Sequence, residues 1–147
     1  MKVLTKSFKV KTKKGAEFID ITDRVKKIIK QTGIKNGIVI VFSKHTTAAI
    51  KINENEPLLI KDMEAFLARV ASPKAFYNHN DFERRTVNMC SDECANGHAH
   101  CQHLVLSTSE KIPLVKGEMA FGLWQRIFLI ELDRPREREV VVQLIGE

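Results

Sequence analysis

The chain has few aromatic side chains and no long apolar segment. It contains one Trp and one Tyr among 147 residues, and its cations are dispersed along the chain, so we expect no nucleic-acid partner. No apolar run approaches the roughly 18 residues of a membrane span, so we expect no membrane partner. The first residues, Met1 to Lys6, lack an apolar core of signal-peptide length. These absences together predict a cytoplasmic protein.

Cysteine is scarce as well. Three cysteines cannot all pair within one chain, and a reducing compartment keeps them as thiols. The 24 Lys and Arg residues exceed the 18 Asp and Glu residues by six, a surplus that attracts phosphorylated small molecules. A chain of this length forms its own core, so we expect a single domain over residues 1–147.

Hydrophobic periodicity predicts about seven strands and two or three helices. Strands are expected at residues 3–11, 17–21, 37–42, 48–53, 111–115, 125–132 and 139–145. Helices are expected from a cap at Thr22 or Asp23 to Gly33, from Pro57 to Val70, and over residues 98–106. Strands and helices do not strictly alternate, which predicts an α+β domain. Residues 73–96 are polar and aperiodic, which is typical of a functional or a disordered segment.

Polar residues follow two of the predicted strands. Ser43-Lys44-His45-Thr46-Thr47 follows a buried strand and is either an anion-binding segment or a plain polar turn. Asn53-Glu54-Asn55-Glu56 precedes the Pro57 helix, where helix capping is the better explanation. His79 lies in the polar segment and is expected to be exposed unless other histidines converge on it. Trp124 is expected in the core, whereas Gln125 is free to present its amide to a cleft.

The segment Cys90 to His103 concentrates the side chains that bind zinc and related metals. It holds all three cysteines and His98, His100 and His103. The spacing of Cys90, Cys94, His98 and His100 departs from that of structural zinc sites. Residues separated by one position also point in nearly opposite directions in a strand or helix. We therefore expect only one of His98 and His100 to be a metal ligand.

Several short motifs in this order resemble the YjbQ-like family, also described as secondary thiamine-phosphate synthases. The matching segments are His45-Thr46-Thr47-Ala48, Asn53-Glu54-Asn55, Asp62-Met63, Tyr77-x-His79-Asn80-Asp81, Ala99-His100, Gly122-x-Trp124-Gln125 and Gly146-Glu147. They span nearly the whole chain, so the set is specific although each motif alone is weak. The resemblance implies an α+β fold with a β-sandwich core that assembles as a homotrimer.

The resemblance also implies a site. The recurrent histidines of the family correspond to His45, His79 and His100, which would bind a divalent metal ion, zinc, and leave a coordination position open. His98 has less support, because family members vary there. Acidic or amide residues with an implied catalytic role are Asp62, Asp81, Glu54 and Gln125. Implied contacts to substrate or phosphate come from Ser43, Lys44, Thr46, Thr47, Asn53, Trp124 and Arg126, with Arg84 and Arg85 as further phosphate partners.

The sequence departs from the family pattern in two places. The segment 82–95 is longer than expected, and Cys101-Gln102-His103 replaces an apolar-basic pair, so the cysteines lack family support as ligands.

One class of function is an enzyme acting on a phosphorylated small molecule, by thiamine-phosphate synthesis or by metal-assisted hydrolysis. The other is a non-catalytic trimer that binds a metal or ligand.

Overall fold

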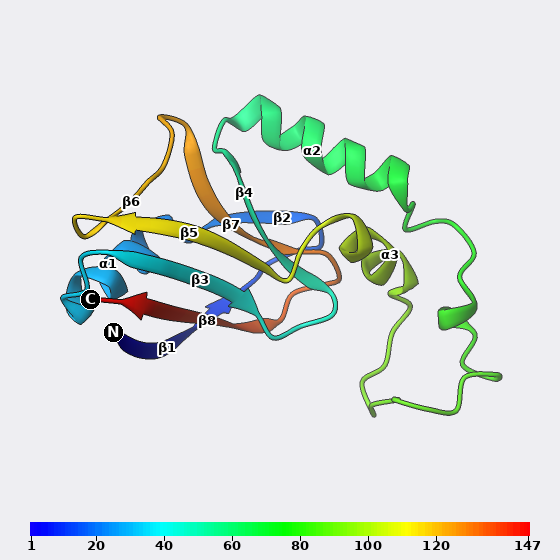
Figure 1. Cartoon of the computed structure of the whole chain (residues 1–147). Coiled ribbons are helices and arrows are strands. Elements are labelled where there is room, and N and C mark those ends of the chain that lie inside the picture. The colour runs from blue at the N-terminus through cyan, green and yellow to red at the C-terminus, as the bar shows by residue number, and fades with distance from the viewer.

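The computed structural model describes all residues 1–147 and contains eight strands in two antiparallel sheets. The five-stranded sheet has the order β1-β8-β3-β5-β6, and the three-stranded sheet has the order β2-β7-β4. The strands are β1 (Lys2–Lys11), β2 (Glu17–Asp20), β3 (Gly37–Ser43), β4 (Ala48–Glu54), β5 (Ser109–Val115), β6 (Glu118–Met119), β7 (Gln125–Glu131) and β8 (Glu137–Gly146). β1 and β8 pair from Lys2↔Gly146 to Lys11↔Glu137, so the two chain ends lie side by side (Figure 1).

Three α-helices and one 3₁₀ turn complete the fold. They are α1 (Thr22–Thr32), α2 (Pro57–Val70), η1 (Asn78–Asn80) and α3 (Gly97–Val105). Every predicted strand and helix is present, with ends shifted by at most two residues, which confirms the α+β class. No helix combines the length and the apolar content needed to cross a membrane.

Alternating side chains of β7 fill two separate clusters. Ile127 and Leu129 pack in a core that also takes side chains from the five-stranded sheet and from α1. Phe128 and Ile130 point the other way and pack with Leu67 of α2. A strand covered on both faces needs a continuous apolar run, and burying each such side chain is worth about 1.5–3 kcal/mol. β7 is therefore the centre of the molecule.

Two details of the predicted elements were wrong. Short strand β6 has only two residues, too few for a periodic signal. Helix α1 begins at Thr22 without a side-chain cap from Thr22 or Asp23. Instead, Asp20 Oδ1 accepts a hydrogen bond of 2.9 Å from the Thr22 amide, while the Thr22 hydroxyl accepts one from the Ile127 amide. Glu56 caps α2 as the Pro57 pattern predicts, accepting from the amides of Leu58 and Leu59.

Candidate functional site

A cavity of about 490 Å³ lies where the β3–β4 turn, the long segment before α3 and the start of β8 meet. It contains the three histidines singled out in the sequence. Its lining residues are Lys44, His45, Thr46, Thr47, His79, Arg85, Asn88, Cys90, Asp92, Glu93, Asn96, His100, Arg136 and Arg138. Seven of them belong to the polar segment 73–96, which is thus an ordered wall of the cavity.

The β3–β4 turn fixes His45 at one side of the cavity. Buried Ser43 donates its hydroxyl hydrogen bond to the Ala48 carbonyl at 2.8 Å, which closes the turn, and Ser43 does not line the cavity. His45 Nε2 accepts a hydrogen bond of 2.8 Å from the Glu139 amide. Burial, with Arg138 nearby, lowers the pKa of His45. The ring is therefore neutral at pH 7, with Nε2 occupied by a backbone donor.

His79 and His100 form a contact pair on another side of the cavity. Their ring centroids lie 4.6 Å apart in an edge-to-face arrangement. Burial lowers the pKa of His100, and His79 and Arg85 lower it further. His79 Nε2 is buried and has no hydrogen-bond partner. His98 lies outside the cavity, tilted against the Tyr77 ring at 6.5 Å.

Helix α3 reaches this position because its first residue is glycine. The Gly97 amide donates to Asn80 Oδ1 at 2.9 Å. A Cβ at Gly97 would lie 2.5 Å from the Tyr77 Cβ, so any other residue would push the η1 segment away. This close approach brings His79 of η1 against His100 of α3.

A buried ion pair between Arg138 and Glu131 holds part of the cavity wall in place. Arg138 is 3% exposed and Glu131 is fully buried, and Arg138 Nε donates to Glu131 Oε2 at 2.6 Å. The Thr12 hydroxyl donates to the same carboxylate at 3.0 Å. Arg138 also donates to Thr47 Oγ1 at 3.0 Å, which holds that residue at the cavity wall.

The other basic side chains of the cavity pair with acids but retain free donors. Lys44 pairs with Glu139 at 2.9 Å, Arg85 with Glu93 at 3.2 Å, and Arg136 with Asp133 at 3.4 Å. Three buried polar atoms on lining residues have no partner: His79 Nε2, Arg85 Nη1 and Asn96 Oδ1. Buried polar groups are rarely left unpaired, so these three atoms mark a place for a ligand or ordered water.

The cavity contains residue types that bind metal ions, but these side chains are not arranged around a common ion position. Neutral imidazoles are good zinc ligands, and His79 Nε2 is free. However, no group of three or more His, Cys, Asp or Glu side chains is placed to hold a metal ion, and His45 Nε2 is already bonded. His79 and His100 are the two histidines whose rings are in contact, whereas His45 would have to use Nδ1 or release the Glu139 amide.

Several predicted site residues lie at the opposite end of the three-stranded sheet. β4 runs from beside Thr47 to Glu54, and β7 runs antiparallel to it from Gln125. At about 3.3 Å per residue, the two ends are roughly 20 Å apart. A second cavity of about 390 Å³ lies there, lined by Asp20, Glu54, Asn55, Glu56, Leu123, Trp124 and Arg126. The chain thus does not bring this group together with the histidines.

The polar side chains at this far end have local partners. Arg126 Nε donates to Asp20 at 2.6 Å, Asn53 donates to the Met63 sulfur at 3.2 Å, and Gln125 Oε1 accepts from the Gly122 amide at 2.8 Å. Trp124 is 65% exposed. The prediction of a core Trp was therefore wrong, because the apolar positions of β7 begin only at Ile127.

Three further predicted residues, Asp62, Asp81 and Arg84, lie outside the histidine cavity. Asp62 is exposed on α2. Asp81 accepts from the Arg84 amide and pairs with Arg84 Nε at 3.0 Å, which makes it a local turn residue. Lys44, Thr46, Thr47 and Arg85 do line the cavity, as expected of phosphate partners.

Arg136, Arg138, Glu93 and Asn96 were missed by the sequence interpretation. Arg136 and Arg138 lie at the end of the connection between β7 and β8 and at the start of β8, and their pattern resembles that of an exposed strand. The available signal was Glu131, an acid between the apolar residues Ile130 and Leu132, where a buried carboxylate needs a buried cation. Cys90 lines the cavity mouth as an exposed free thiol.

Fold and site together define an α+β domain of two antiparallel sheets with a cavity lined by histidine and arginine. The chain belongs to the family described as UPF0047 protein YjbQ-like, whose model matches residues 6–147. It is 37% identical to a UPF0047 protein of Methanothermobacter thermautotrophicus over 147 residues, covering 100% of this chain and 95% of the relative. It is 31% identical to UPF0047 protein YugU of Bacillus subtilis, covering 97% and 100%.

Solved structures agree with this membership. A YbjQ-like protein of unknown function from Sulfolobus solfataricus superposes with a TM-score of 0.89 at 37% identity, covering 99% of both chains. The hypothetical protein APE1520 of Aeropyrum pernix superposes with a TM-score of 0.87 at 35% identity, covering 98% of this chain and 99% of the other.

Proposed function

We propose that the histidine cavity binds a small phosphorylated molecule. The observation that carries this proposal is that three buried polar atoms without a partner, His79 Nε2, Arg85 Nη1 and Asn96 Oδ1, belong to the lining of one cavity. Arg85 Nη1 is a charged donor suited to phosphate oxygens, and charge-assisted hydrogen bonds of this kind are the strong ones. Because Arg85 also pairs with Glu93 through Nη2, its guanidinium is held in place while Nη1 has no partner.

We propose further that a divalent metal ion, zinc, binds beside this molecule. His79 and His100 would hold it first, with His45 as the third ligand after a local rearrangement. Such an ion would neutralise the charge on a departing phosphate or diphosphate, as the thiamine-phosphate synthase resemblance requires. The chain's own contribution is to hold the phosphate with Arg85 and Arg136 and to keep the imidazoles of His45 and His100 neutral, since burial lowers the pKa of each.

Titration with inorganic phosphate tests the anion part of the proposal. Arg85→Gln removes a free donor and should weaken binding about tenfold or more, since a charged hydrogen bond contributes about 1.5–3 kcal/mol. The matched control is Arg84→Gln, because Arg84 is its neighbour yet lies outside the cavity. Equal affinities for the two variants would refute the assignment.

Metal analysis of the purified protein tests the zinc part. His79→Ala and His100→Ala should each lower the zinc content, and His45→Ala should lower it too. His98→Ala, which alters the same helix outside the cavity, should keep the wild-type content. Full zinc retention in the first three variants would refute the assignment of these histidines as zinc ligands and would leave the phosphate test unaffected.

We also propose that the protein is a cytoplasmic homotrimer with a sandwich-like core. Three free cysteines suit a reducing compartment. Side chains of both sheets share one core cluster, which supports the sandwich. Leu123 and Trp124 are 84% and 65% exposed beside the second cavity, and neighbouring large apolar side chains of this kind support an interface.

A further inference from the structure

The positive charge of the chain is concentrated in its first quarter. Residues 1–35 contain eleven Lys or Arg and three Asp or Glu, whereas residues 36–147 contain thirteen and fifteen. The first part thus carries +8 and the remainder −2. These cations alternate with apolar residues, so they look dispersed along the sequence. Five of them, Lys6 of β1 and Arg24, Lys26, Lys27 and Lys30 of α1, line two hollows beside α1 in the folded chain.

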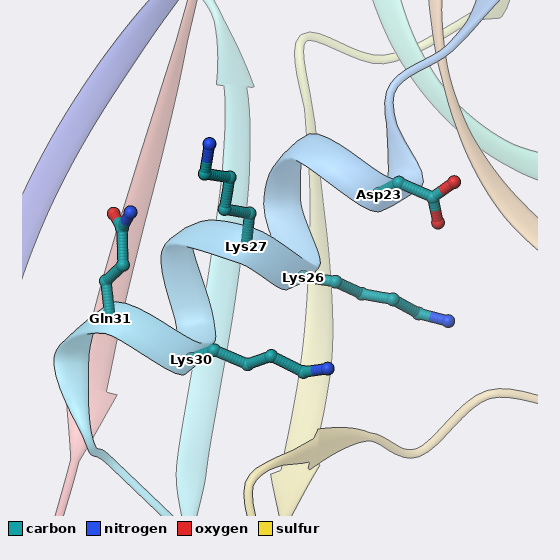
Figure 2. Close-up of a pocket in the computed structure, with 5 residues that line it drawn as sticks. All are labelled: Asp23, Lys26, Lys27, Lys30 and Gln31. Atoms are coloured by element: carbon teal, nitrogen blue, oxygen red, sulfur yellow. The ribbon is translucent and has the colours of Figure 1, made fainter.

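Helix α1 lies between two hollows that share its basic side chains. The hollow between β1 and α1 measures about 320 Å³ and contains Lys6, Arg24 and Lys27. The hollow on the other side measures about 430 Å³ and contains Lys26, Lys27 and Lys30. In Figure 2, Lys26 and Lys30 extend together to one side of α1, while Lys27 and Gln31 extend from another. The cations therefore form one continuous surface, which we call the α1 basic face.

Nothing within the chain neutralises this face. None of Lys6, Arg24, Lys26, Lys27 and Lys30 takes part in an ion pair. The one acid of the face, Asp23, is within 3.4 Å of Arg126 instead. Lys26 and Lys30 stand four positions apart on one helix, an arrangement in which like charges destabilise the helix. The lysines of edge strand β1 also discourage pairing with another sheet, but that role does not apply to α1.

The geometry of the face indicates what kind of anion fits it. Arg24 is held in place by a hydrogen bond of 2.9 Å to the Lys9 carbonyl and by the Phe8 ring 5.4 Å away. Lysines one helical turn apart are about 6 Å apart, so the face repeats its charge along its length. A single small anion contacts only some of the cations of the α1 basic face, whereas a chain of phosphates can contact all of them.

We propose that the α1 basic face binds the phosphate backbone of nucleic acid without reading the base sequence. The outer face of α1 carries no exposed aromatic side chain for base stacking. It also carries no exposed apolar residue to enter a lipid surface, which favours nucleic acid over a membrane. The expectation of no nucleic-acid partner rested on cations dispersed along the chain and on the scarcity of Trp and Tyr. The folded surface does not share the first feature, and contacts to the phosphate backbone do not need the second.

Fluorescence anisotropy with a labelled 20-base-pair duplex of random sequence tests the proposal. Five phosphate contacts predict that wild-type affinity falls about 500-fold between 50 and 200 mM salt. The variant Lys26→Gln/Lys27→Gln/Lys30→Gln keeps two contacts, so its affinity should fall only about 12-fold over that range. It should also bind at least tenfold more weakly at 50 mM salt.

The matched control is Lys61→Gln/Lys74→Gln/Lys111→Gln, which removes the same charge from exposed lysines elsewhere. It should keep affinity within twofold of wild type, as should Arg85→Gln in the histidine cavity. Equal losses in both triple variants would reduce the effect to net charge and overturn the proposal. So would a wild-type salt dependence near zero, or tighter binding to phosphatidylserine vesicles than to the duplex at equal anion concentration. Circular dichroism checks that each variant is folded.

Discussion

The buried ion pair of Glu131 and Arg138 stabilises the wall of the histidine cavity. Glu131 is fully buried, and Arg138 is its one cationic partner. Arg138→Met should lower the free energy of unfolding by about 3–5 kcal/mol, because it leaves a buried carboxylate without a counter-charge. Urea unfolding at pH 7 measures this loss.

Two further variants separate the charge effect from lost packing. Glu131→Leu/Arg138→Met removes both charges and should recover much of the stability, since apolar replacement of a buried ion pair is often neutral. Lys44→Met breaks the exposed pair with Glu139 and should change stability far less. A double variant no more stable than Arg138→Met would contradict this explanation.

At the same scale, the sequence predicts some cavity residues and not others. The argument that His98 and His100 point apart agrees with their placement, because the direction of side chains on a helix is local geometry. The grouping of Glu54, Trp124 and Arg126 with the histidines does not hold within one chain, because β4 and β7 separate them along their length. Arg136 and Arg138 were not identified, because charged residues alternating in a strand resemble an exposed edge, and the pattern does not show that Arg138 pairs with the buried Glu131.

At the scale of elements, the contact between η1 and α3 depends on Gly97. Gly97→Ala should displace the η1 segment, separate His79 from His100 and weaken phosphate binding, because the new methyl group overlaps Tyr77. Overpacking of this kind costs about 1–3 kcal/mol. Calorimetry gives the stability change, and titration with inorganic phosphate gives the affinity change.

The matched control for this element is Gly122→Ala. A Cβ at Gly122 meets nothing nearer than Gln125 Oε1 at 3.6 Å, which is ordinary van der Waals contact. That variant should match wild type in both measurements. If Gly97→Ala also matched wild type, the close approach of α3 to η1 would not control the site.

The elements also show where the hydrophobic pattern of the sequence no longer predicts structure. Periodicity identified α2 because its apolar residues recur at helical spacing, although only Leu67 is buried, and an unbroken apolar run identified β7, whose last five positions are buried. It was silent over residues 73–96, where side-chain contacts such as Arg85 to Glu93 and Arg134 to Asp92 hold the backbone in place. Those contacts join residues by charge rather than by period, so only the folded chain reveals them.

At the scale of the whole molecule, the two cavities and the α1 basic face lie on different elements. The histidine cavity is lined by the β3–β4 turn, the segment before α3 and the start of β8, whereas Leu123 and Trp124 are exposed in the connection between β6 and β7. Because these elements differ, assembly through Leu123 and Trp124 and ligand binding are expected to be separable properties.

This separation gives the last prediction. Leu123→Ser/Trp124→Ser should convert the particle from three times 16.8 kDa to a single chain, because it removes the apolar area that an interface of this kind buries. Sedimentation equilibrium measures the mass, and the monomer should still bind inorganic phosphate within about twofold of wild-type affinity. Leu104→Ser, equally exposed on α3, serves as the control and should keep the trimer. A monomeric wild type would refute the assembly, and a monomeric variant that no longer binds phosphate would mean that neighbouring copies complete the site.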